Sequence, residues 1–493
     1  MTRPRIALSM YGGTGTGSAV VSGLRNYQLG YAGLLSEMGV DVIPFYLDEI
    51  GTSRWDATKL YDQAPTGEHR FLMRRSDRIM ALPAEALEAG VHYPENWHRL
   101  SQAFNAFFRR QRIDGLSIIE WLPAGMALWQ SALEFDKPVV FTPTEHGAIC
   151  QYGFLLHNCG AACSGPDDGS KCGRCTHSLE PFPPVIDSPI WYSRRHRLFH
   201  RATECLPERL QRAVLWQLSE HLQHPGAVIS EAHGIARVSS ARRFLTSPRI
   251  VCHYQGAHQH QVFQRALGCQ LPAPLPMFMP TPLAVHAGER PSSLRRQAPC
   301  AGPMKFLFAA RPSFDRGLWL LLQAWERWQP DPEQARLLVF THREGARSER
   351  TVASINSRRE TVELHYGLLS KDRLLALHRQ IHFVINPAVW EEPGSATVGE
   401  ALLLGTPCIV PTSTGSSDFI IDGANGYTFS FRNTDDLVGT LERAVANRAD
   451  WSLLHEGALR TGEELRRSSV RSLVEMTKTL LPGFSPTTSN FDV

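Results

Sequence analysis

The sequence predicts an α/β protein with two doubly wound domains, each a mostly parallel sheet with helices packed on its faces. Three observations support this fold class. Buried-strand patterns alternate with helical patterns over residues 1–265, a Pro-rich stretch without hydrophobic period covers 266–303, and the alternation resumes over 304–465. A chain of 493 residues with 43% hydrophobic content is long and apolar enough for two such cores. For 466–493 we predict a helix and then a disordered tail.

The first domain opens with a strand, a Gly-rich loop, a helix and a second strand. The stretch "RIALSMY" (5–11) has the pattern of a buried strand, and the helix after the loop ends near Gly39. Four later apolar segments, each bounded by turn residues, predict further buried strands of a parallel sheet. They are residues 115–122, 137–144, 226–230 and 248–254.

The second domain repeats the alternation of strands and helices. Strands are predicted in 304–310, 335–342, 361–367 and 381–388, and helices in 316–328 and 370–380. The next helix is expected from Ala396 to about Leu404, with Ser395 as its N-cap and Gly405 as its stop. Ligand sites in open parallel sheets lie beyond the carboxyl ends of the strands. We therefore expect the two domains to face each other across a cleft that holds the site.

Charge and hydropathy exclude several classes of protein. Lys and Arg (51) nearly balance Asp and Glu (48), so the formal charge of +3 gives no basic field of the kind that nucleic-acid binders have. No apolar run is long enough to span a bilayer, and the N-terminus reaches Gly12 too early for a signal peptide, which predicts a cytoplasmic protein. The basic, aromatic stretch 191–201 reads as a solvated helix face; the alternative is peripheral contact with the inner membrane face.

The stretch "WEEPGSATVGEALLLGTP" (390–407) carries the strongest chemical pattern. Glu392 lies at the mouth of a loop and Glu400 lies about one and a half turns into the predicted helix. The free N–H groups of a helix's first turn carry partial positive charge and can hold a phosphate without any lysine. The stretch thus combines an anion site with two carboxylates.

At this point the chain resembles a known family. The stretch "INPAVWEEPGSATVGEALLLGTPCIVPTSTG" (385–415) is similar to the C-terminal signature of glycosyltransferase family 4, retaining enzymes of the GT-B fold, and "FAARPSFDRGLW" (308–319) is similar to their Arg-x4-Lys-Gly segment. The stretch "SPRIVCHYQGAH" (247–258) resembles their hinge loop in an altered form. The resemblance covers most of 303–465 and is patchier before it.

The resemblance implies roles for individual residues. Arg311 and Arg316, which stands where the family usually has Lys, would bind the donor diphosphate. Glu392 would lie beside the transferred sugar and Glu400 on the ribose hydroxyls, while Glu391 competes for the first role at a less suitable spacing. Further donor-binding positions implied in this half are Gly394, Ser395, Ala396, Thr397, Gly367 and Leu369.

Three candidate site residues lie in the first half of the chain. Gly12 and Gly13 follow the first strand, where small residues let a loop approach a ligand closely. The glycine spacing after them differs from the dinucleotide fingerprint, so a nicotinamide site is rejected. His146 follows a predicted strand as the family's His-Asp does, although Gly147 replaces Asp, and it would bond sugar hydroxyls; the alternatives are a tight turn at the glycines and a satisfied half-buried histidine.

Four cysteines cluster in a Gly- and Asp-rich loop, which the resemblance identifies with the Cys-rich insertion of some family members, at about 150–200. Cys159, Cys163, Cys172 and Cys175 provide four thiolates for a tetrahedral, structural zinc site; free thiols or disulfides are the alternative. Cys150 and His157 are nearby substitutes as ligands. No catalytic divalent metal is expected, because the two arginines would neutralise the diphosphate.

The expected function is a retaining, hexosyltransferase-type glycosyltransferase that moves a sugar from a nucleotide-diphosphate sugar to an acceptor hydroxyl. The acceptor would be a saccharide, a lipid-linked glycan or a small molecule, bound on the side of the domain formed by 1–265. A sugar phosphorylase or nucleotide-sugar epimerase of the same fold, and a non-catalytic sugar-nucleotide-binding subunit, are the competing hypotheses. The identity of the sugar and of the base, and the oligomeric state, are not encoded in these motifs.

Overall fold

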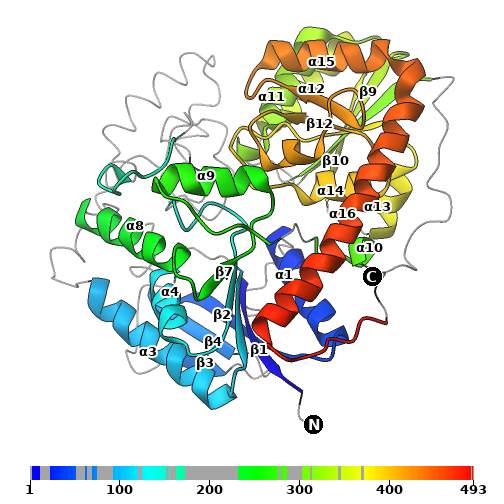
Figure 1. Cartoon of the computed structure of the whole chain (residues 1–493). Coiled ribbons are helices and arrows are strands. Elements are labelled where there is room, and N and C mark those ends of the chain that lie inside the picture. Colours follow the sequence, from blue (N-terminus) through cyan, green and yellow to red (C-terminus); the bar gives the residue numbers. More distant parts are fainter. Residues whose placement is uncertain are drawn as a thin grey trace. The chain divides into compact units, whose positions relative to one another are not determined.

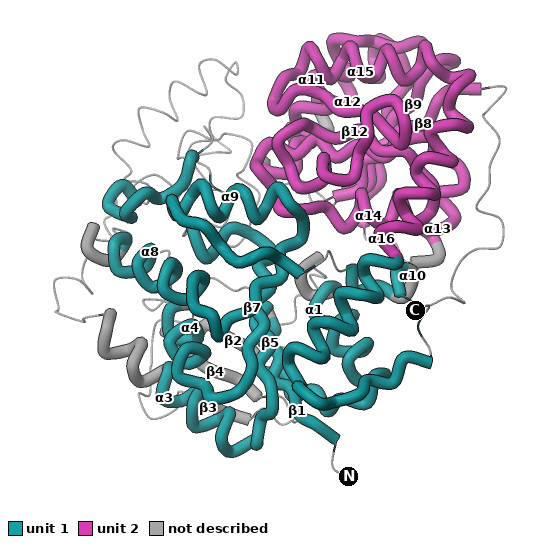
Figure 2. The backbone as a smooth tube through the Cα atoms, viewed as in Figure 1, with its two compact units in different colours: residues 1–179, 223–288, 467–493 teal, residues 180–222, 289–466 magenta. Residues whose placement is uncertain are grey.

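The chain forms two compact units, each built around its own sheet (Figures 1 and 2). Unit 1 comprises 1–179, 223–288 and 467–493, and the described part of unit 2 lies within 289–466. The computed structural model describes residues 3–11, 23–50, 61–63, 69–74, 93–119, 125–150, 155, 163–172, 231–275, 279–285, 302–310, 314–341, 346–367, 371–489 and 491.

Unit 1 contains a seven-stranded sheet of order β3-β4-β2-β1-β5-β6-β7, in which only the β3–β4 pair is antiparallel. Its strands are β1 (Arg5–Tyr11), β2 (Asp41–Ile50), β3 (Tyr61–Gln63), β4 (His69–Arg74), β5 (Gly115–Ile119), β6 (Val139–Thr142) and β7 (Ile250–Cys252). The predicted strands at 5–11, 115–122, 137–144 and 248–254 are confirmed; the one at 226–230 lies outside the described residues.

The helices of unit 1 are α1 (Gly23–Glu37), α3 (Tyr93–Gln111), α4 (Gly125–Glu134), α8 (Glu231–Leu245), α9 (Ala257–Leu267) and α10 (Pro282–Val285). Helix α3 packs against α4, and α4 against α8. Between α3 and the sheet, Phe45 of β2 meets Phe104, Phe107 and Phe108 with ring centroids 5.7 to 5.9 Å apart. Such edge-on and tilted aromatic contacts fill much of this core.

Unit 2 contains a six-stranded parallel sheet of order β10-β9-β8-β11-β12-β13. The strands are β8 (Met304–Ala309), β9 (Ala335–Thr341), β10 (Val362–Tyr366), β11 (Phe383–Ile385), β12 (Cys408–Pro411) and β13 (Gly426–Phe429). The helices are α11 (Leu318–Trp328), α12 (Ala346–Arg358), α13 (Lys371–His378), α14 (Ala396–Leu403), α15 (Thr434–Ala446) and the first part of α16 (Trp451–Leu480), which belongs to unit 1 from residue 467 onward; short 3-10 turns are η3 (Phe314–Arg316), η4 (Gly415–Phe419) and η5 (Arg448–Asp450). The predicted two-sheet α/β fold is confirmed.

Two segments differ from the sequence-based expectation. The stretch 266–303, predicted as an extended linker, contains α10, and its Ala284 and Val285 are fully buried. The tail predicted as disordered lies against unit 1, where the Thr487 N–H donates to the Met38 carbonyl at 3.2 Å. In both cases a few apolar side chains bury themselves against a surface that is distant in sequence, which no local pattern reveals.

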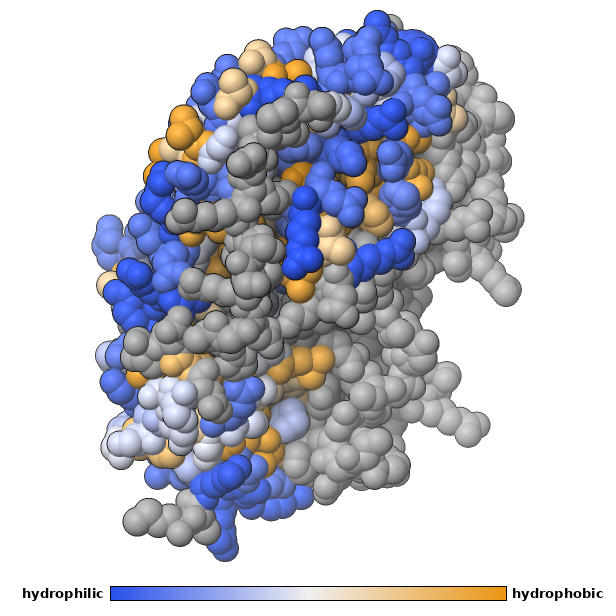
Figure 3. All heavy atoms as spheres, turned by 90° about the vertical axis from the view of Figure 1, so that its right-hand side faces the viewer, coloured by the Kyte–Doolittle hydropathy of each residue, from blue (hydrophilic) through white to orange (hydrophobic). Residues whose placement is uncertain are grey.

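The surface is mixed in polarity. On the face in Figure 3, hydrophilic side chains are interspersed with smaller hydrophobic patches. Large apolar side chains that are exposed among the described residues are Leu29, Ile235, Tyr366, Ile421 and Leu453. Within the described part of the chain, we find no helix with both the length and the hydropathy of a membrane span.

Candidate functional site

The strand order of unit 2 fixes where a site is expected. Strand β8 is central; β9 and β10 follow on one side of it, and β11, β12 and β13 on the other. The order therefore reverses between β8 and β11, and ligands of doubly wound sheets bind at the carboxyl ends of the strands at such a switch point. Three loops leave the sheet there, after β8, β11 and β12.

Glu392, in the loop after β11, is the centre of a buried polar cluster. Its side chain is fully buried, and its Oε1 accepts hydrogen bonds from Asn386 Nδ2 and, at 2.7 Å, from Ser416 Oγ. Its Oε2 is 3.3 Å from Arg316 Nη1. The loops after all three strands thus meet at this one carboxylate.

Arg316 lies between two carboxylates. Besides the contact with Glu392, its Nε is 3.2 Å from Asp315 Oδ2, and its Cζ is 6.0 Å from the centroid of the buried Trp390 ring. The side chain of Arg316 is a quarter exposed. Arg316 is therefore a cation that Asp315 and Glu392 hold in place and that remains partly exposed to solvent.

The protonation of Glu392 reflects two opposing influences. Burial raises the pKa of its carboxyl, whereas the charge of Arg316 and the hydrogen bonds from Ser416 and Asn386 act in the opposite direction; burial prevails. Two of these contacts fall on Oε1, so a sugar hydroxyl would have to reach Oε2, beside Arg316, or replace a present partner. The sequence placed Glu392 at the mouth of the loop, and the structure places it below the surface.

Two glycines allow these loops to approach one another. A Cβ on Gly415 would lie 1.7 Å from the Pro393 carbonyl oxygen, and one on Gly317 would lie 1.8 Å from the Pro387 carbonyl oxygen. Gly317 also has φ +71°, which favours glycine. The Gly415 N–H donates to the Glu392 carbonyl at 2.7 Å. The backbone around Glu392 is therefore held by contacts that admit no larger residue.

Helix α14 begins directly after this loop. Its predicted start at Ala396 and its stop at Gly405 (φ +71°) are confirmed, and the Thr406 N–H closes the end on the Ala401 carbonyl at 2.8 Å. Ser395 is at the N-cap position, but its side chain makes no capping hydrogen bond. Thr397 Oγ1 is 3.5 Å from the Ala309 carbonyl oxygen, which ties the helix start to the end of β8.

Glu400 lies on α14 and is half-buried. Burial raises the pKa of its carboxyl to about 7. Within the part of the chain that the structure describes, this carboxylate has no hydrogen-bond or ion-pair partner. A desolvated and unpaired acceptor of this kind can take hydrogen bonds from ligand hydroxyls.

The remaining predicted site residues are dispersed. Gly394 lies in the same loop as Glu392, and Gly367 follows β10 with φ +125°, its N–H donating to the Thr341 carbonyl at 3.0 Å. His146 belongs to unit 1, where its buried ring packs on Phe263 at 5.9 Å. Of the residues predicted to bind the sugar or the nucleotide, four lie outside the described part of the chain: Gly12, Gly13, Arg311 and Leu369.

Of the four clustered cysteines, Cys163 and Cys172 are described, and Cys159 and Cys175 are not. Burial raises the pKa of the Cys172 thiol to about 11 and also raises that of Cys163. Cys150 acts electrostatically on both thiols. Among the described residues, no group of three or more His, Cys, Asp or Glu side chains is arranged to hold a metal ion.

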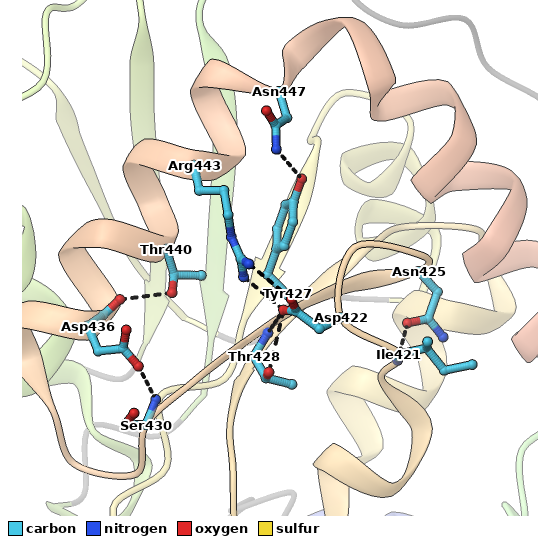
Figure 4. Close-up of polar contacts among 10 residues, drawn as sticks. All are labelled: Ile421, Asp422, Asn425, Tyr427, Thr428, Ser430, Asp436, Thr440, Arg443 and Asn447. Carbon is cyan, nitrogen blue, oxygen red and sulfur yellow. Dashed lines mark hydrogen bonds and ion pairs between the residues drawn. The ribbon is translucent and has the colours of Figure 1, made fainter.

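A second carboxylate–arginine pair lies in the same unit, near its surface (Figure 4). Asp422 accepts from Arg443 Nη1 and Nη2 at 2.9 and 2.8 Å and from the Thr428 N–H at 2.8 Å. The Arg443 guanidinium also lies over the Tyr427 ring, 4.5 Å from its centroid. Burial opposes the ionisation of Asp422, but these hydrogen bonds and the charge of Arg443 lower the pKa of its carboxyl.

Sequence reasoning missed three residues of the cluster around Glu392, namely Asp315, Asn386 and Ser416. All three lie just beyond the ends of β8, β11 and β12. Asn386 follows a wholly apolar strand, and this position of a polar side chain is a signal that could have identified it. Asp315 and Ser416 have no comparable local signal, because their role depends on loops that are far apart in sequence.

Comparison with known proteins gives the following matches. Residues 293–459 match the family described as glycosyl transferases group 1, so unit 2 carries a domain of this family. The lipopolysaccharide 1,2-N-acetylglucosaminetransferase of Salmonella typhimurium is 26% identical over 189 residues, which are 36% of this chain. The chain spans about half (50%) of the length of this curated relative.

Solved structures resemble the whole chain. Sucrose-phosphate synthase of Thermosynechococcus elongatus has a TM-score of 0.55 at 15% identity, with 97% of this chain and 98% of that chain covered. HepE of Anabaena, solved with UDP, has a TM-score of 0.53 at 12% identity, with 97% and 100% covered. An Escherichia coli trehalose-6-phosphate protein bound with UDP-2-fluoro glucose has a TM-score of 0.53 at 11% identity, with 98% and 100% covered. These likenesses establish the GT-B architecture of two parallel-sheet α/β domains.

Proposed function

We propose that this chain, with its glycosyl transferases group 1 domain, is a glycosyltransferase that moves a sugar from a nucleoside diphosphate sugar to an acceptor hydroxyl. The observation that carries this proposal is the position of Arg316. A partly exposed guanidinium lies at the switch point of the unit 2 sheet, fixed by two carboxylates. Phosphate oxygens are partners that a guanidinium binds strongly, often with two parallel hydrogen bonds.

The donor chemistry follows from the surroundings of Arg316. Arg311 and Arg316 would bind the diphosphate from one side, and the first-turn N–H groups of α14, which the Ser395 side chain does not cap, would bind it from another. Negative charge grows on the diphosphate as the glycosidic bond breaks, and fixed positive groups stabilise it. These groups would serve where other transferases use a divalent metal ion.

Two carboxylates would complete the donor site. Glu400, desolvated and without a described partner, would accept hydrogen bonds from the ribose hydroxyls. Glu392 would fix Arg316 and, after exchange of a partner, accept a bond from the transferred sugar. Transfer with retention of configuration, in which the leaving phosphate assists deprotonation of the acceptor, is the mechanism that the resemblance to glycosyltransferase family 4 implies.

The ligands of the similar proteins suggest the nucleotide. HepE was solved with UDP and with UDP-glucose, and the Escherichia coli protein with UDP-2-fluoro glucose. A uridine diphosphate sugar is therefore the first donor to try. The acceptor would be bound by unit 1. In this unit we propose that His146 bonds hydroxyls of the sugar and that Gly12 and Gly13 contribute to donor binding.

Zinc is proposed as a structural component of unit 1. Cys163 and Cys172, two of the four proposed ligands, lie in a segment whose Gly165 and Gly169 pack against Ala266 and Gly234. The donor set of thiols suits zinc. Metal analysis of the purified protein tests this: one zinc per chain is expected, and a protein with no zinc that keeps its melting temperature after chelation would refute it.

A binding screen followed by an assay tests the proposed function. UDP and UDP-sugars should raise the melting temperature, and the sugar that stabilises most should be transferred to an acceptor with its anomeric configuration retained, as read by NMR. Glu392→Gln should lower the turnover by at least about 100-fold, because an amide N–H would then face Arg316. The absence of stabilisation by any nucleoside diphosphate would refute the proposal.

A further inference from the structure

A continuous chain of polar side chains runs through unit 2 beneath Arg316. It begins at Ser416 and Asn386, passes through the Glu392 carboxylate and ends at the pair of Arg316 with Asp315. Ser416 is fully buried, and Asn386 is 7% exposed. Neither Asn386 nor Ser416 reaches the surface enough to be explained as a solvated polar residue.

With Glu392 ionised, the protons of this chain have one consistent arrangement. An ionised carboxylate can only accept, so the Asn386 amide must present its nitrogen to Glu392. The same nitrogen is 3.3 Å from Ser416 Oγ, which accepts from it, and the single Ser416 proton then points to Glu392 Oε1 at 2.7 Å. Both donors therefore bond one oxygen, Oε1, and leave Oε2 for Arg316.

The backbone places the two donors without help from the Glu392 side chain. The Asn386 N–H donates to the Ile409 carbonyl at 3.0 Å, which continues the β11–β12 ladder to the end of the strand. Ser416 lies in η4, whose Gly415 is packed against the Pro393 carbonyl. The end of β11 therefore fixes the Asn386 donor, and the tight turn of η4 fixes the Ser416 donor. Neither position requires the Glu392 carboxylate.

We propose that Asn386 and Ser416 are positioning residues for donor binding: they hold Oε1 of Glu392 so that Oε2 fixes the guanidinium of Arg316. This inference rests on the proposed function, because it assigns Arg316 to the donor diphosphate. Asp315 fixes the same guanidinium at Nε, 3.2 Å away. A planar fork held at two of its nitrogens has its orientation set before the ligand arrives, which lowers the entropic cost of binding.

The first test needs no ligand. The side-chain carboxyl carbons of glutamate are labelled with 13C, the Glu392 signal is identified as the one lost in Glu392→Gln, and its pH titration is followed by NMR. In Ser416→Ala the ionised form loses a hydrogen bond, so the titration midpoint should rise by about one pH unit. The matched control is Ser417→Ala, because the Ser417 hydroxyl donates to the Thr414 carbonyl at 2.6 Å instead. It should leave the midpoint unchanged.

The second test connects the chain to the donor. Calorimetric titration with UDP at pH 7 should show affinity lowered by about 10-fold in Ser416→Ala and in Asn386→Ser, and unchanged in Ser417→Ala. Added to Glu392→Gln, Ser416→Ala should have little further effect, because both act through the same carboxylate. If Ser416→Ala does not fold, Asn386→Ser, whose side chain is too short to reach Glu392, provides both measurements.

The outcomes separate this inference from the proposed function. An unchanged NMR midpoint in a folded Ser416→Ala or Asn386→Ser protein overturns the positioning role, whatever the protein binds. A raised midpoint together with UDP affinity equal to that of the wild type overturns the link to the donor. A raised midpoint in the variants, together with a wild-type protein that binds no nucleoside diphosphate, would refute the proposed function and leave the hydrogen-bond assignment standing.

Discussion

Two carboxylate–arginine pairs in unit 2 have opposite surroundings. Glu392 and Arg316 meet at the switch point of the sheet, with the carboxylate fully buried and a single contact of 3.3 Å between them. Asp422 and Arg443 form two hydrogen bonds, of 2.8 and 2.9 Å, with both side chains about two-fifths exposed. The better-made pair is on the surface, where pairs contribute little to stability, and the costlier pair is buried beside the candidate site.

This difference teaches where to look for function. Asp422 and Arg443 satisfy each other, and Figure 4 shows them among other closed contacts that join the turn at 421–425, β13 and α15. Glu392 is desolvated, and Arg316 shares its charge between two carboxylates while it still reaches solvent. Burying the Glu392 carboxylate carries a desolvation cost, and this carboxylate holds Arg316 at the switch point of the sheet. Such an arrangement indicates a binding function more strongly than a contribution to stability.

The largest expected effect is a difference in UDP affinity between variants of Arg316 and of Arg443. Arg316→Ala should weaken UDP binding by about 10- to 100-fold, because a charge-assisted contact to phosphate is removed. Arg443→Ala should leave UDP affinity within about twofold of the wild type. Calorimetric titration of both variants checks this, and equal losses in the two would contradict the assignment of the site to the switch point.

The next effect concerns the glycine beside each pair. Gly317→Ala should lower the free energy of unfolding by about 3 kcal/mol, since its Cβ would meet the Pro387 carbonyl and its φ is +71°. Gly423→Ala is the matched control, because φ is +76° there and no atom lies within 4 Å of the added Cβ. It should cost only about 1 kcal/mol, for the backbone strain. Urea unfolding measures both; similar losses would mean that the loop after β11 can move away.

A smaller effect is the pH dependence of stability, which should differ in sign between Glu400 of the candidate site and Asp422 of the surface pair. Burial raises the pKa of Glu400 to about 7, so the folded state holds this proton more tightly than the unfolded chain. The resulting stability is complete below the ordinary carboxyl pKa and is lost as the pH rises through about 7. Between pH 5 and 7.5, the melting temperature of Glu400→Gln should therefore decrease less steeply with rising pH than that of the wild type. An identical slope would contradict the desolvation of Glu400.

The smallest effect has the opposite sign. The pKa of Asp422 is lowered, so its contribution to stability is present above the ordinary aspartate pKa and is lost as the pH falls through the lowered value. Asp422→Asn should cost less than about 1 kcal/mol at pH 7, and the cost should vanish in acid. Urea unfolding at a series of pH values from 7 down to about 2 measures this; a cost that stays constant over the whole series would indicate a role in packing.

Local patterns predicted the elements that carry the site. The Ser395–Gly405 punctuation gave the bounds of α14 to within one residue, and the apolar runs gave every strand of unit 2 up to β11. They did not give α12, β3 or β4. Helix α12 is rich in polar residues, and β3 pairs only with β4 at the sheet edge, so both depend on tertiary contacts more than on sequence period.

The candidate site was less predictable than the fold. Glu392 and Glu400 were identified by their spacing, but the burial of Glu392 was not, because it depends on Ser416 and Arg316, which are 24 and 76 residues away. The sequence assigned Arg316 to phosphate alone, and its partners Asp315 and Glu392 became visible only with the loops in place. Spacing along one helix can be read locally, whereas contacts between loops cannot.

Helix α16 has a consequence for the synthesis of the protein. Its residues from 467 onward belong to unit 1, where the Leu480 carbonyl lies 2.5 Å from the place of a Cβ on Gly115 and Ser469 Oγ accepts from the Met279 N–H at 3.0 Å. Unit 1, which begins at the start of the chain, therefore cannot be completed until residues near the end of the chain have been synthesised. On the ribosome, we expect unit 1 to stay incomplete and open to protease until α16 emerges, which limited proteolysis of chains arrested before and after 467–493 would reveal.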